Sequence, residues 1–405
     1  MPAEPKAIEA LPLELLRPIS GRHLEAILPL LAPLQLTALD TLTLGDLLTL
    51  GDAGHDPHLT VVLAWLFAAL NEGSVCLKLD PGQICRYGLT DPEAAGDHLR
   101  AFLDRLEAGN YEGLVDEADT LTGLPLVRVK GGAGDQADLL YFQRFYRHEE
   151  GLKSRLERFL DGGAAPLCDP ARLDTLVADL WRPERVIRLG PGRTPLAADP
   201  WQMKALDLVL RRAFAVISAG PGTGKTSLMV NLLRLFTACG ISAVDIRLTA
   251  PTGRAAQRMR EAVQVYLPGI DAPSEAEEAL LHIEAGTLHK LLRYQRRTQS
   301  FHYHAGHPLP ARAVIVDEVS MIDVGILDRL LQAIDPARTR LILLGDKDQL
   351  PSVQAGAVFA SLMPRLEDGG SPEVEGGSRD SSGHPLRDHL VVLQTSYRSG
   401  KGLLA

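Results

Sequence analysis

The sequence contains few cysteines, and none of them is spaced for metal binding. Its four cysteines, Cys76, Cys85, Cys168 and Cys239, are scattered along the chain without a Cys-x-x-Cys pair. This spacing excludes the common zinc and iron–sulfur sites. The thiols are therefore expected to be reduced, which is typical of a cytoplasmic protein.

The sequence also lacks long apolar runs, and its first residues do not resemble a leader. The longest apolar stretch, Leu59–Leu70, is too short to span a bilayer and predicts a buried helix. The opening residues, Met1–Lys6, lack the basic and apolar regions of a signal peptide. We therefore expect a cytoplasmic protein without a membrane segment.

An excess of positive charge is absent as well. The chain has 42 basic and 51 acidic residues and a formal net charge of −9. This charge excludes a protein that binds nucleic acid through a globally basic surface, so any such site must be a local patch. The 405 residues, 45% of them hydrophobic and 23% charged, are sufficient for two or three globular domains.

The hydrophobic pattern changes near residue 190 and predicts an α/β fold. Residues 1–190 are mainly helical in pattern, and the strand-like runs among them lie at 74–79, 125–129 and 139–142. A Gly/Pro-rich joint at 189–195 precedes a second domain, residues 191–405, in which apolar runs alternate with helical stretches. Those runs lie at 214–218, 246–250, 313–316, 340–344 and 390–393. Apolar strands separated by helices predict a parallel sheet, and the Gly-, Ser- and acid-rich residues 367–384 predict a surface loop.

A phosphate-binding loop is the strongest motif in the chain. Residues 219–226 read A-G-P-G-T-G-K-T between a strand-like and a helix-like run, with Ala219 in place of the usual first glycine. Glycines bring backbone N–H groups close to phosphate oxygens, Lys225 can reach the β- and γ-phosphates, and Thr226 can ligate Mg²⁺. The residues expected to hold ATP are Gly220, Pro221, Gly222, Thr223, Gly224, Lys225, Thr226 and Ser227. The alternative is a Gly-rich turn before a lysine, which the flanking strand and helix disfavour.

Two acids follow another apolar strand. Asp317 and Glu318 come directly after residues 313–316, so they are expected at the carboxyl edge of the sheet, where α/β folds bind ligands. Asp317 would hold Mg²⁺, and Glu318 would orient and polarise the attacking water. A simple strand end is the alternative interpretation.

Two further polar groups follow later strands. Gln349, with Asp346, could reach the γ-phosphate or the attacking water, although a strand-to-helix turn would contain similar residues. Arg398 follows the last strand and could stabilise transition-state charge on the γ-phosphate, unless it is an ordinary surface arginine.

Two loops have features of a single-stranded nucleic acid site. Pro251, Thr252, Gly253 and Arg254 link a strand to a helix that also carries Arg258 and Arg260. Hydroxyls, backbone N–H groups and a helix N-terminus suit phosphates. Thr287 and His289 begin a second such segment, which continues into basic residues 290–297. A solvated helix face is the alternative for this basic cluster.

Taken in chain order, these segments resemble motifs I, Ia, Ib, II, III and IV of the superfamily 1 helicases. Their amino-acid sequences are similar to those of the RecD branch. The segments are the P-loop, T-A-P-T-G-R-A-A, A-G-T-L-H-K-L-L, V-D-E-V-S-M, L-L-G-D-K-D-Q-L-P-S-V-Q-A-G and L-Q-T-S-Y-R. Asp199–Gln202 is similar to the segment whose glutamine contacts adenine, which makes Gln202 a further ATP ligand. Residues 73–77 and 141–150 look like the RecD subunit of RecBCD, so the resemblance covers essentially the whole chain.

The resemblance implies a RecA-like P-loop ATPase domain at 191–405 and a docking role for residues 1–190. It implies an ATP- and Mg²⁺-dependent motor that moves 5′ to 3′ on the 5′-ended single strand of DNA. It also implies a heterotrimer with RecB- and RecC-type subunits that acts in double-strand break repair. Helicases of this kind have a second motor domain with motifs V and VI. Because the sequence stops at Ala405, we expect a truncated product, fragment or split half that unwinds DNA poorly by itself.

Other function classes remain open at this point. The chain could be a P-loop ATPase of another kind, such as a switch or a loader. It could also be a non-catalytic assembly subunit, or a helicase that acts on RNA. Stimulation of ATP hydrolysis by single-stranded DNA would distinguish the helicase from a P-loop ATPase of another kind. Binding to a partner subunit without ATP hydrolysis would indicate a non-catalytic assembly subunit.

Overall fold

The structure is a computed structural model that describes most of the chain in two compact units. The described residues are 27–51, 56–84, 87, 92–132, 137–162, 164–167, 169–349, 359, 362–363 and 386–395. Residues up to Glu150 belong to the first unit, and the described residues from Gly151 belong to the second. The hydrophobic pattern of the sequence predicts a later domain boundary, at residue 190. The segment between these positions belongs to the second unit because Val177, Leu180 and Ile187 are buried in its core.

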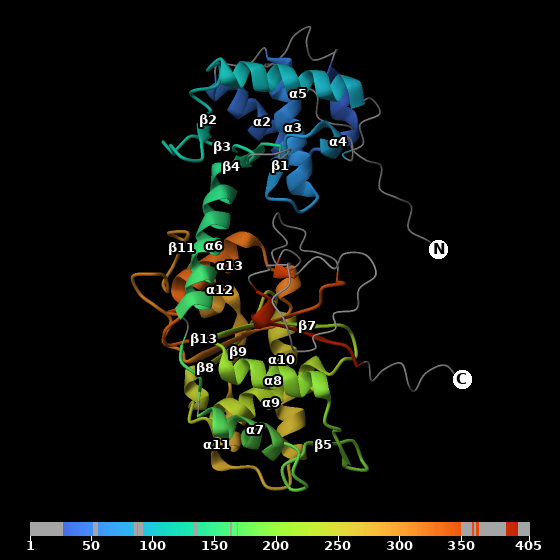
Figure 1. The fold of residues 1–405 in the computed structure, drawn as a ribbon, viewed down its shortest axis with the longest axis vertical. Coiled ribbons are helices and arrows are strands. Elements are labelled where there is room, and N and C mark those ends of the chain that lie inside the picture. Colours follow the sequence, from blue (N-terminus) through green and yellow to red (C-terminus); the bar gives the residue numbers. More distant parts are fainter. Residues whose placement is uncertain are drawn as a thin grey trace, which may run out of the picture. The chain divides into compact units, whose positions relative to one another are not determined.

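The first unit combines helices with a small sheet (Figure 1). Its helical elements are η2 (Ala32–Leu34), α2 (Ala38–Leu50), α3 (Pro57–Asn71), α4 (Pro81–Ile84) and α5 (Pro92–Glu107), followed by α6 (Gln143–Gly162) across the unit boundary. Its strands are β1 (Cys76–Lys78), β2 (Val115–Glu117), β3 (Leu126–Val129) and β4 (Leu139–Phe142), paired in the order β1-β4-β3-β2. Three of these strands lie where strand-like runs were predicted; β2 was missed.

Helix α3 is the buried helix that the apolar run predicted. The Asp56 carboxylate caps its N-terminus by accepting a hydrogen bond from the backbone N–H of His58 at 2.9 Å, and Pro57 starts the first turn. Apolar side chains then surround the helix, and Trp65 is fully buried. In the described part of the chain, no helix has the length and apolar character that crossing a membrane would require.

The second unit is built on a six-stranded parallel sheet in the order β14-β7-β13-β12-β8-β9. The strands are β7 (Phe214–Ala219), β8 (Ile246–Ala250), β9 (Ala285–Thr287), β12 (Ala313–Val316), β13 (Arg340–Gly345) and β14 (Leu390–Leu393). Two short antiparallel pairs accompany it: β5 (Arg188–Leu189) with β6 (Thr194–Pro195), and β10 (Tyr294–Gln295) with β11 (Ser300–Phe301). All five predicted strands are present, which confirms the α/β fold with a parallel sheet.

Helices cover both faces of this sheet. In Figure 1, α8 (Pro200–Arg211), α9 (Lys225–Ala238) and α10 (Gly253–Tyr266) lie on one side, and α13 (Val324–Ala333) lies on the other. The remaining helical elements are α7 (Pro170–Asp179), η4 (Ala243–Asp245), η5 (Leu267–Gly269), α11 (Glu275–Glu278), η6 (Ala279–His282), α12 (Leu288–Leu291), η7 (Val319–Met321) and η8 (Arg387–His389).

Strand register fixes which residues meet at the carboxyl edge. Val316 of β12 is paired with Leu343 of β13 on one side and with Thr249 of β8 on the other. Gly345 pairs with Ser218, and Ala250 pairs with Thr287. The residues that follow these strands therefore line one continuous edge of the sheet.

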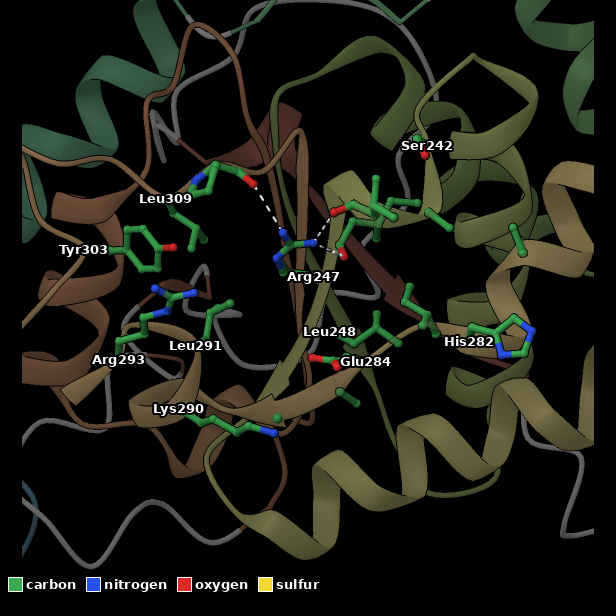
Figure 2. A pocket seen from close by; sticks show the side chains of 18 residues that line it. Ser242, Arg247, Leu248, His282, Glu284, Lys290, Leu291, Arg293, Tyr303 and Leu309 are labelled. Carbon is green, nitrogen blue, oxygen red and sulfur yellow. Dashed lines mark hydrogen bonds between the residues drawn. The ribbon is translucent and has the colours of Figure 1, made fainter. Parts of the chain in front are cut away.

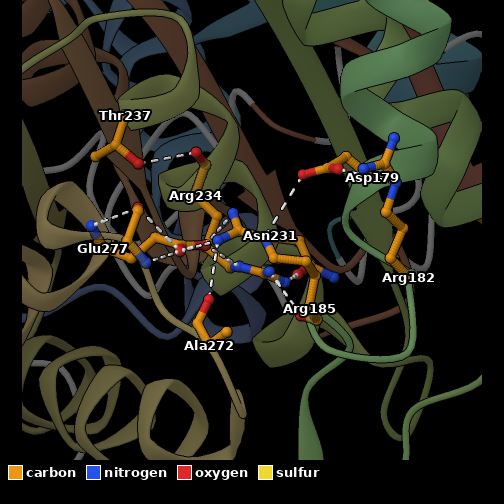
Figure 3. Close-up of polar contacts among 9 residues, drawn as sticks. Asp179, Arg182, Arg185, Asn231, Arg234, Thr237, Ala272 and Glu277 are labelled. Carbon is orange, nitrogen blue, oxygen red and sulfur yellow. Dashed lines mark hydrogen bonds and ion pairs between the residues drawn. The ribbon is translucent and has the colours of Figure 1, made fainter.

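A buried ionic network joins α9 to the segments around it (Figure 3). Arg234 and Glu277 are each only 1% exposed, and the Arg234 Nε lies 2.7 Å from a Glu277 carboxylate oxygen. Arg185 contacts the other carboxylate oxygen at 2.8 Å, and Arg234 also donates to the Asn231 side chain at 3.0 Å. Ser274 completes a capping box with Glu277. One carboxylate therefore connects three segments that are distant in sequence.

We expect Glu277→Gln to lower the free energy of unfolding of the second unit by about 3–5 kcal/mol, because two arginines lose their buried counter-charge. Urea denaturation measures this change. Glu278→Gln is the matched control, since its exposed neighbouring carboxylate should change stability by less than about 0.5 kcal/mol. An equal loss in both variants would contradict the network's role.

The ion pairs of Glu277 also predict that the stability of the second unit depends on pH. Burial raises the pKa of the Glu277 carboxyl, but hydrogen bonds from Arg234 and the Ser274 backbone outweigh burial and hold the pKa below its usual value. This carboxylate therefore stabilises the fold above the unfolded-state pKa, and its contribution disappears as the pH falls through the lower folded-state pKa. The stability difference between wild type and Glu277→Gln should shrink across that acidic range. A difference that stays constant there would contradict this account.

Candidate active site

The predicted phosphate-binding loop connects β7 to α9. Gly222 and Gly224 adopt positive φ angles of 82° and 83°, which allow the chain to curl back on itself. Gly224 is the N-cap of α9 and provides no side-chain cap, so the first-turn N–H groups remain available to an anion. The Thr223 hydroxyl closes the turn by donating to the Gly220 carbonyl at 2.8 Å. The local structure is the strand–loop–helix arrangement that the motif requires.

Gln202 lies beside this loop. It is 5% exposed, and its side-chain amide donates to the Thr223 carbonyl at 3.4 Å. Asp199 positions it by capping α8, accepting from the Gln202 backbone N–H at 2.9 Å. The residue that was expected to contact adenine is therefore fixed against the phosphate loop.

The two acids after β12 face cations. The Lys225 Nζ lies 2.9 Å from an Asp317 carboxylate oxygen, which joins the phosphate loop to the neighbouring acidic motif. Glu318 has a positive φ of 53°, and its backbone N–H donates to the Asp317 carboxylate at 2.8 Å. A Glu318 carboxylate oxygen lies 3.8 Å from the guanidinium of Arg258 on α10. This last contact joins two residues that the sequence had placed in separate functions.

The residues after β13 also reach this region. The Ser320 hydroxyl donates to the Gln349 side chain at 3.3 Å, so Gln349 lies near the acidic motif. Asp346 is 3% exposed and accepts from the Asp348 backbone N–H at 3.1 Å, which makes it part of the turn. Arg398 lies outside the described residues, as does the predicted loop at 367–384.

A cavity of about 570 Å³ opens over the phosphate loop. Gln202, Lys225, Thr226 and Gln349 contribute to its lining. Other lining residues were missed by sequence reasoning because they belong to no motif: Trp181, Leu196, Asn231 and Tyr266. The two aromatic residues provide flat apolar surface, and the volume is typical of a small-molecule site.

The cavity and the loop fit a nucleoside triphosphate and a hard divalent cation. Open backbone N–H groups and Lys225 suit phosphate oxygens, and the Thr226 hydroxyl with the Asp317 carboxylate are oxygen ligands of the kind that Mg²⁺ prefers. No cluster of three or more His, Cys, Asp or Glu side chains suited to a metal exists among the described residues. Such a cluster is unnecessary here, because magnesium in phosphate-transfer sites takes most ligands from phosphates and water.

The loops predicted to bind DNA lie next to each other. Thr252 caps α10 by accepting from the Ala255 N–H at 3.2 Å, and Thr287 caps α12 by accepting from the Lys290 N–H at 3.3 Å. Thr252 follows β8 and Thr287 is the last residue of β9, and these strands are paired neighbours in the sheet. The exposed ring of His289 contacts Tyr294 and Phe301, with centroid distances of 5.5 and 5.9 Å. The fold thus gathers both predicted DNA segments at one end of the sheet edge.

A second hollow, of about 720 Å³, lies beside β8 and β9 (Figure 2). Figure 2 shows Arg247 between its walls, where the guanidinium donates to the backbone carbonyls of Ile246 at 3.1 Å and Pro310 at 3.4 Å. Lys290 and Arg293 also line it. It is larger than the cavity over the phosphate loop but contains none of the predicted catalytic residues, so volume alone does not locate the chemistry.

Comparisons with known proteins support the resemblance to RecD-type helicases. The family model described as "AAA domain" matches residues 202–355. The RecBCD enzyme subunit RecD of Mycolicibacterium smegmatis is 32% identical over 389 residues, which cover 93% of this chain and 59% of that protein. Nearly the whole chain is therefore similar to part of a RecD subunit, which supports the resemblance to the RecD-like superfamily 1 helicases.

Two other RecD-type relatives extend this finding. The RecBCD enzyme subunit RecD of Mycobacterium tuberculosis is 35% identical over 352 residues, covering 85% of this chain and 51% of that protein. The ATP-dependent RecD2 DNA helicase of Deinococcus radiodurans is 30% identical over 223 residues, covering 55% of this chain and 26% of that protein. The chain therefore spans just over half the length of its mycobacterial RecD relatives.

We expect Gly224→Ala to weaken nucleotide binding by about tenfold or more. The backbone at Gly224 has a positive φ, which alanine rarely adopts. An added Cβ would also collide with the Gln202 amide and would lie 3.1 Å from the Ser227 hydroxyl. Binding of a fluorescent ATP analogue to the purified protein measures the effect. Gly253→Ala is the matched control, because a Cβ there meets no atom within 4 Å. Unchanged binding by Gly224→Ala would contradict the phosphate-loop geometry.

Proposed function

We propose that this chain is the ATP-hydrolysing RecD-type subunit of a RecBCD-like DNA helicase–nuclease. The observation that carries the proposal is the 2.9 Å contact between Lys225 of the phosphate loop and Asp317. It brings the two halves of a Mg²⁺–ATP site together at one sheet edge. The predicted DNA loops follow β8 and β9 at the same edge. The names and identities of the RecD relatives support the same assignment.

In this proposal the nucleotide site has a clear division of roles. Gly220–Ser227 hold the phosphates, Gln202 recognises adenine, and Thr226 and Asp317 hold Mg²⁺. A bound Mg²⁺ neutralises phosphate charge and orients the triphosphate. Glu318 orients the attacking water, Gln349 senses the γ-phosphate and Arg398 stabilises its developing charge. Lys225 must exchange its contact with Asp317 for the phosphates when nucleotide binds.

The same proposal assigns the DNA path and the partners. Pro251–Arg254, Thr287 and His289 contact the backbone of the 5′-ended single strand, and translocation runs 5′ to 3′. RecB- and RecC-type subunits complete a cytoplasmic heterotrimer that acts in double-strand break repair, and residues 1–190 dock against them. Relatives described as RecBCD enzyme subunits support this assembly. Hydrolysis of ATP by the protein assembled with these partners should increase when single-stranded DNA is added, whereas the chain alone should respond little.

Lys225→Ala should reduce DNA-stimulated ATP hydrolysis by about 10²–10³-fold, because the variant loses a charge placed for the transition state. Phosphate release with and without single-stranded DNA measures this loss. Lys204→Ala, an exposed lysine of α8, is the control and should hydrolyse ATP normally. Activity of Lys225→Ala within a few-fold of wild type would contradict the proposed site.

Glu318→Gln should bind ATP and Mg²⁺ normally but hydrolyse ATP more slowly, by about 10²-fold or more. The amide keeps the size of the side chain and loses the charge that orients water. Equilibrium binding and single-turnover hydrolysis on the same preparation separate the two effects. If binding fails while the rate per bound nucleotide is unchanged, Glu318 is a metal or structural residue instead.

A further inference from the structure

The contact between Arg258 and Glu318 belongs to neither the nucleotide site nor the DNA site alone. Arg258 lies on α10, the helix that begins directly after the predicted DNA loop Pro251–Thr252. Glu318 follows β12 and is the proposed water-orienting residue. Their side chains approach to 3.8 Å, with Arg258 61% exposed and Glu318 21% exposed. The exposed guanidinium of Arg258 therefore contacts one oxygen of the Glu318 carboxylate, which is proposed to orient the attacking water.

Both candidate catalytic carboxylates are held by cations in this structure. Lys225 holds Asp317, and Arg258 holds Glu318. The first cation belongs to the phosphate loop, so ATP itself would release Asp317. The second belongs to α10, the helix that follows the predicted DNA loop. A group that attracts Arg258 would therefore release Glu318.

The position of Arg258 on α10 indicates what that attractant is. Arg254, a predicted DNA contact, lies four residues earlier, so both arginines project from the same face of the helix. Thr252 caps this helix at the DNA loop. A phosphate bound at the N-terminal turn would lie about one helical turn from Arg258 and would compete directly with Glu318.

We propose that Arg258 is a positioning residue that couples DNA binding to ATP hydrolysis. Without DNA it pairs with Glu318 and keeps that carboxylate from orienting water. When a DNA phosphate engages Arg258, Glu318 is released to its catalytic role. An ion pair this exposed changes an equilibrium by only about two- to fivefold, so one phosphate contact is enough to reverse it. This inference rests on the proposed function, because it requires both ATP hydrolysis and DNA binding.

The coupling is reciprocal, which gives a test that needs no hydrolysis. If DNA draws Arg258 away from Glu318, removing the Glu318 charge must leave Arg258 free for DNA. We therefore expect Glu318→Gln to tighten binding of a fluorescein-labelled oligothymidylate by about two- to fivefold without nucleotide. The same change made in an Arg258→Gln background should have no effect, and Arg258→Lys should retain part of the effect. Fluorescence anisotropy on the full chain compares the three backgrounds (wild type, Arg258→Gln and Arg258→Lys), each with and without Glu318→Gln.

Glu284→Gln is the control for general charge, because it removes an exposed carboxylate beside the other DNA loop. Its effect should be the same whether residue 258 is arginine or glutamine. The coupling is overturned if Glu318→Gln fails to tighten binding, or tightens it equally in both backgrounds. If wild type does not bind oligothymidylate at all, the proposed function falls together with the coupling.

Discussion

The parallel register of the six-stranded sheet is the constraint on which the rest of the structure depends. Because the strands of this sheet are parallel, the loops that follow them all lie at the same edge. The order β14-β7-β13-β12-β8-β9 puts the phosphate loop and the turn at Asp346 on one part of that edge. It puts the two predicted DNA loops on the other. Strand β12, which carries Asp317 and Glu318, lies between them, so one acidic motif borders both sites.

Packing behind the edge keeps the phosphate loop in place. Helix α9 starts at Lys225, and its side chain Arg234 lies fully buried against Glu277. Asn231, which accepts a hydrogen bond from Arg234, also lines the cavity over the loop. A structural ion network thus extends to the wall of the candidate nucleotide site. This arrangement explains why Arg234 and Glu277, which lie outside the predicted catalytic set, are buried so deeply in this unit.

The sequence predicted the elements whose signals are local. Strands such as residues 313–316 are continuous apolar runs, and the phosphate loop has a fixed spacing of glycine and lysine. Strand β9 was missed because Ala285–Thr287 has no apolar run and is stabilised by pairing with β8. Trp181 and Tyr266 were missed because only tertiary packing brings them to the cavity. The contact between Arg258 and Glu318 joins separate motifs, so no local sequence pattern could predict it.

In the proposed function, one sheet edge is divided between nucleotide and DNA. Hydrogen exchange of the backbone amides, measured with Mg²⁺ and an ATP analogue and then with oligothymidylate, tests it most directly. The nucleotide should protect residues 220–227, and the oligonucleotide should protect residues 251–254 and 287–289. Protection of the phosphate loop by DNA alone, or DNA protection confined to the hollow around Arg247, would contradict this division.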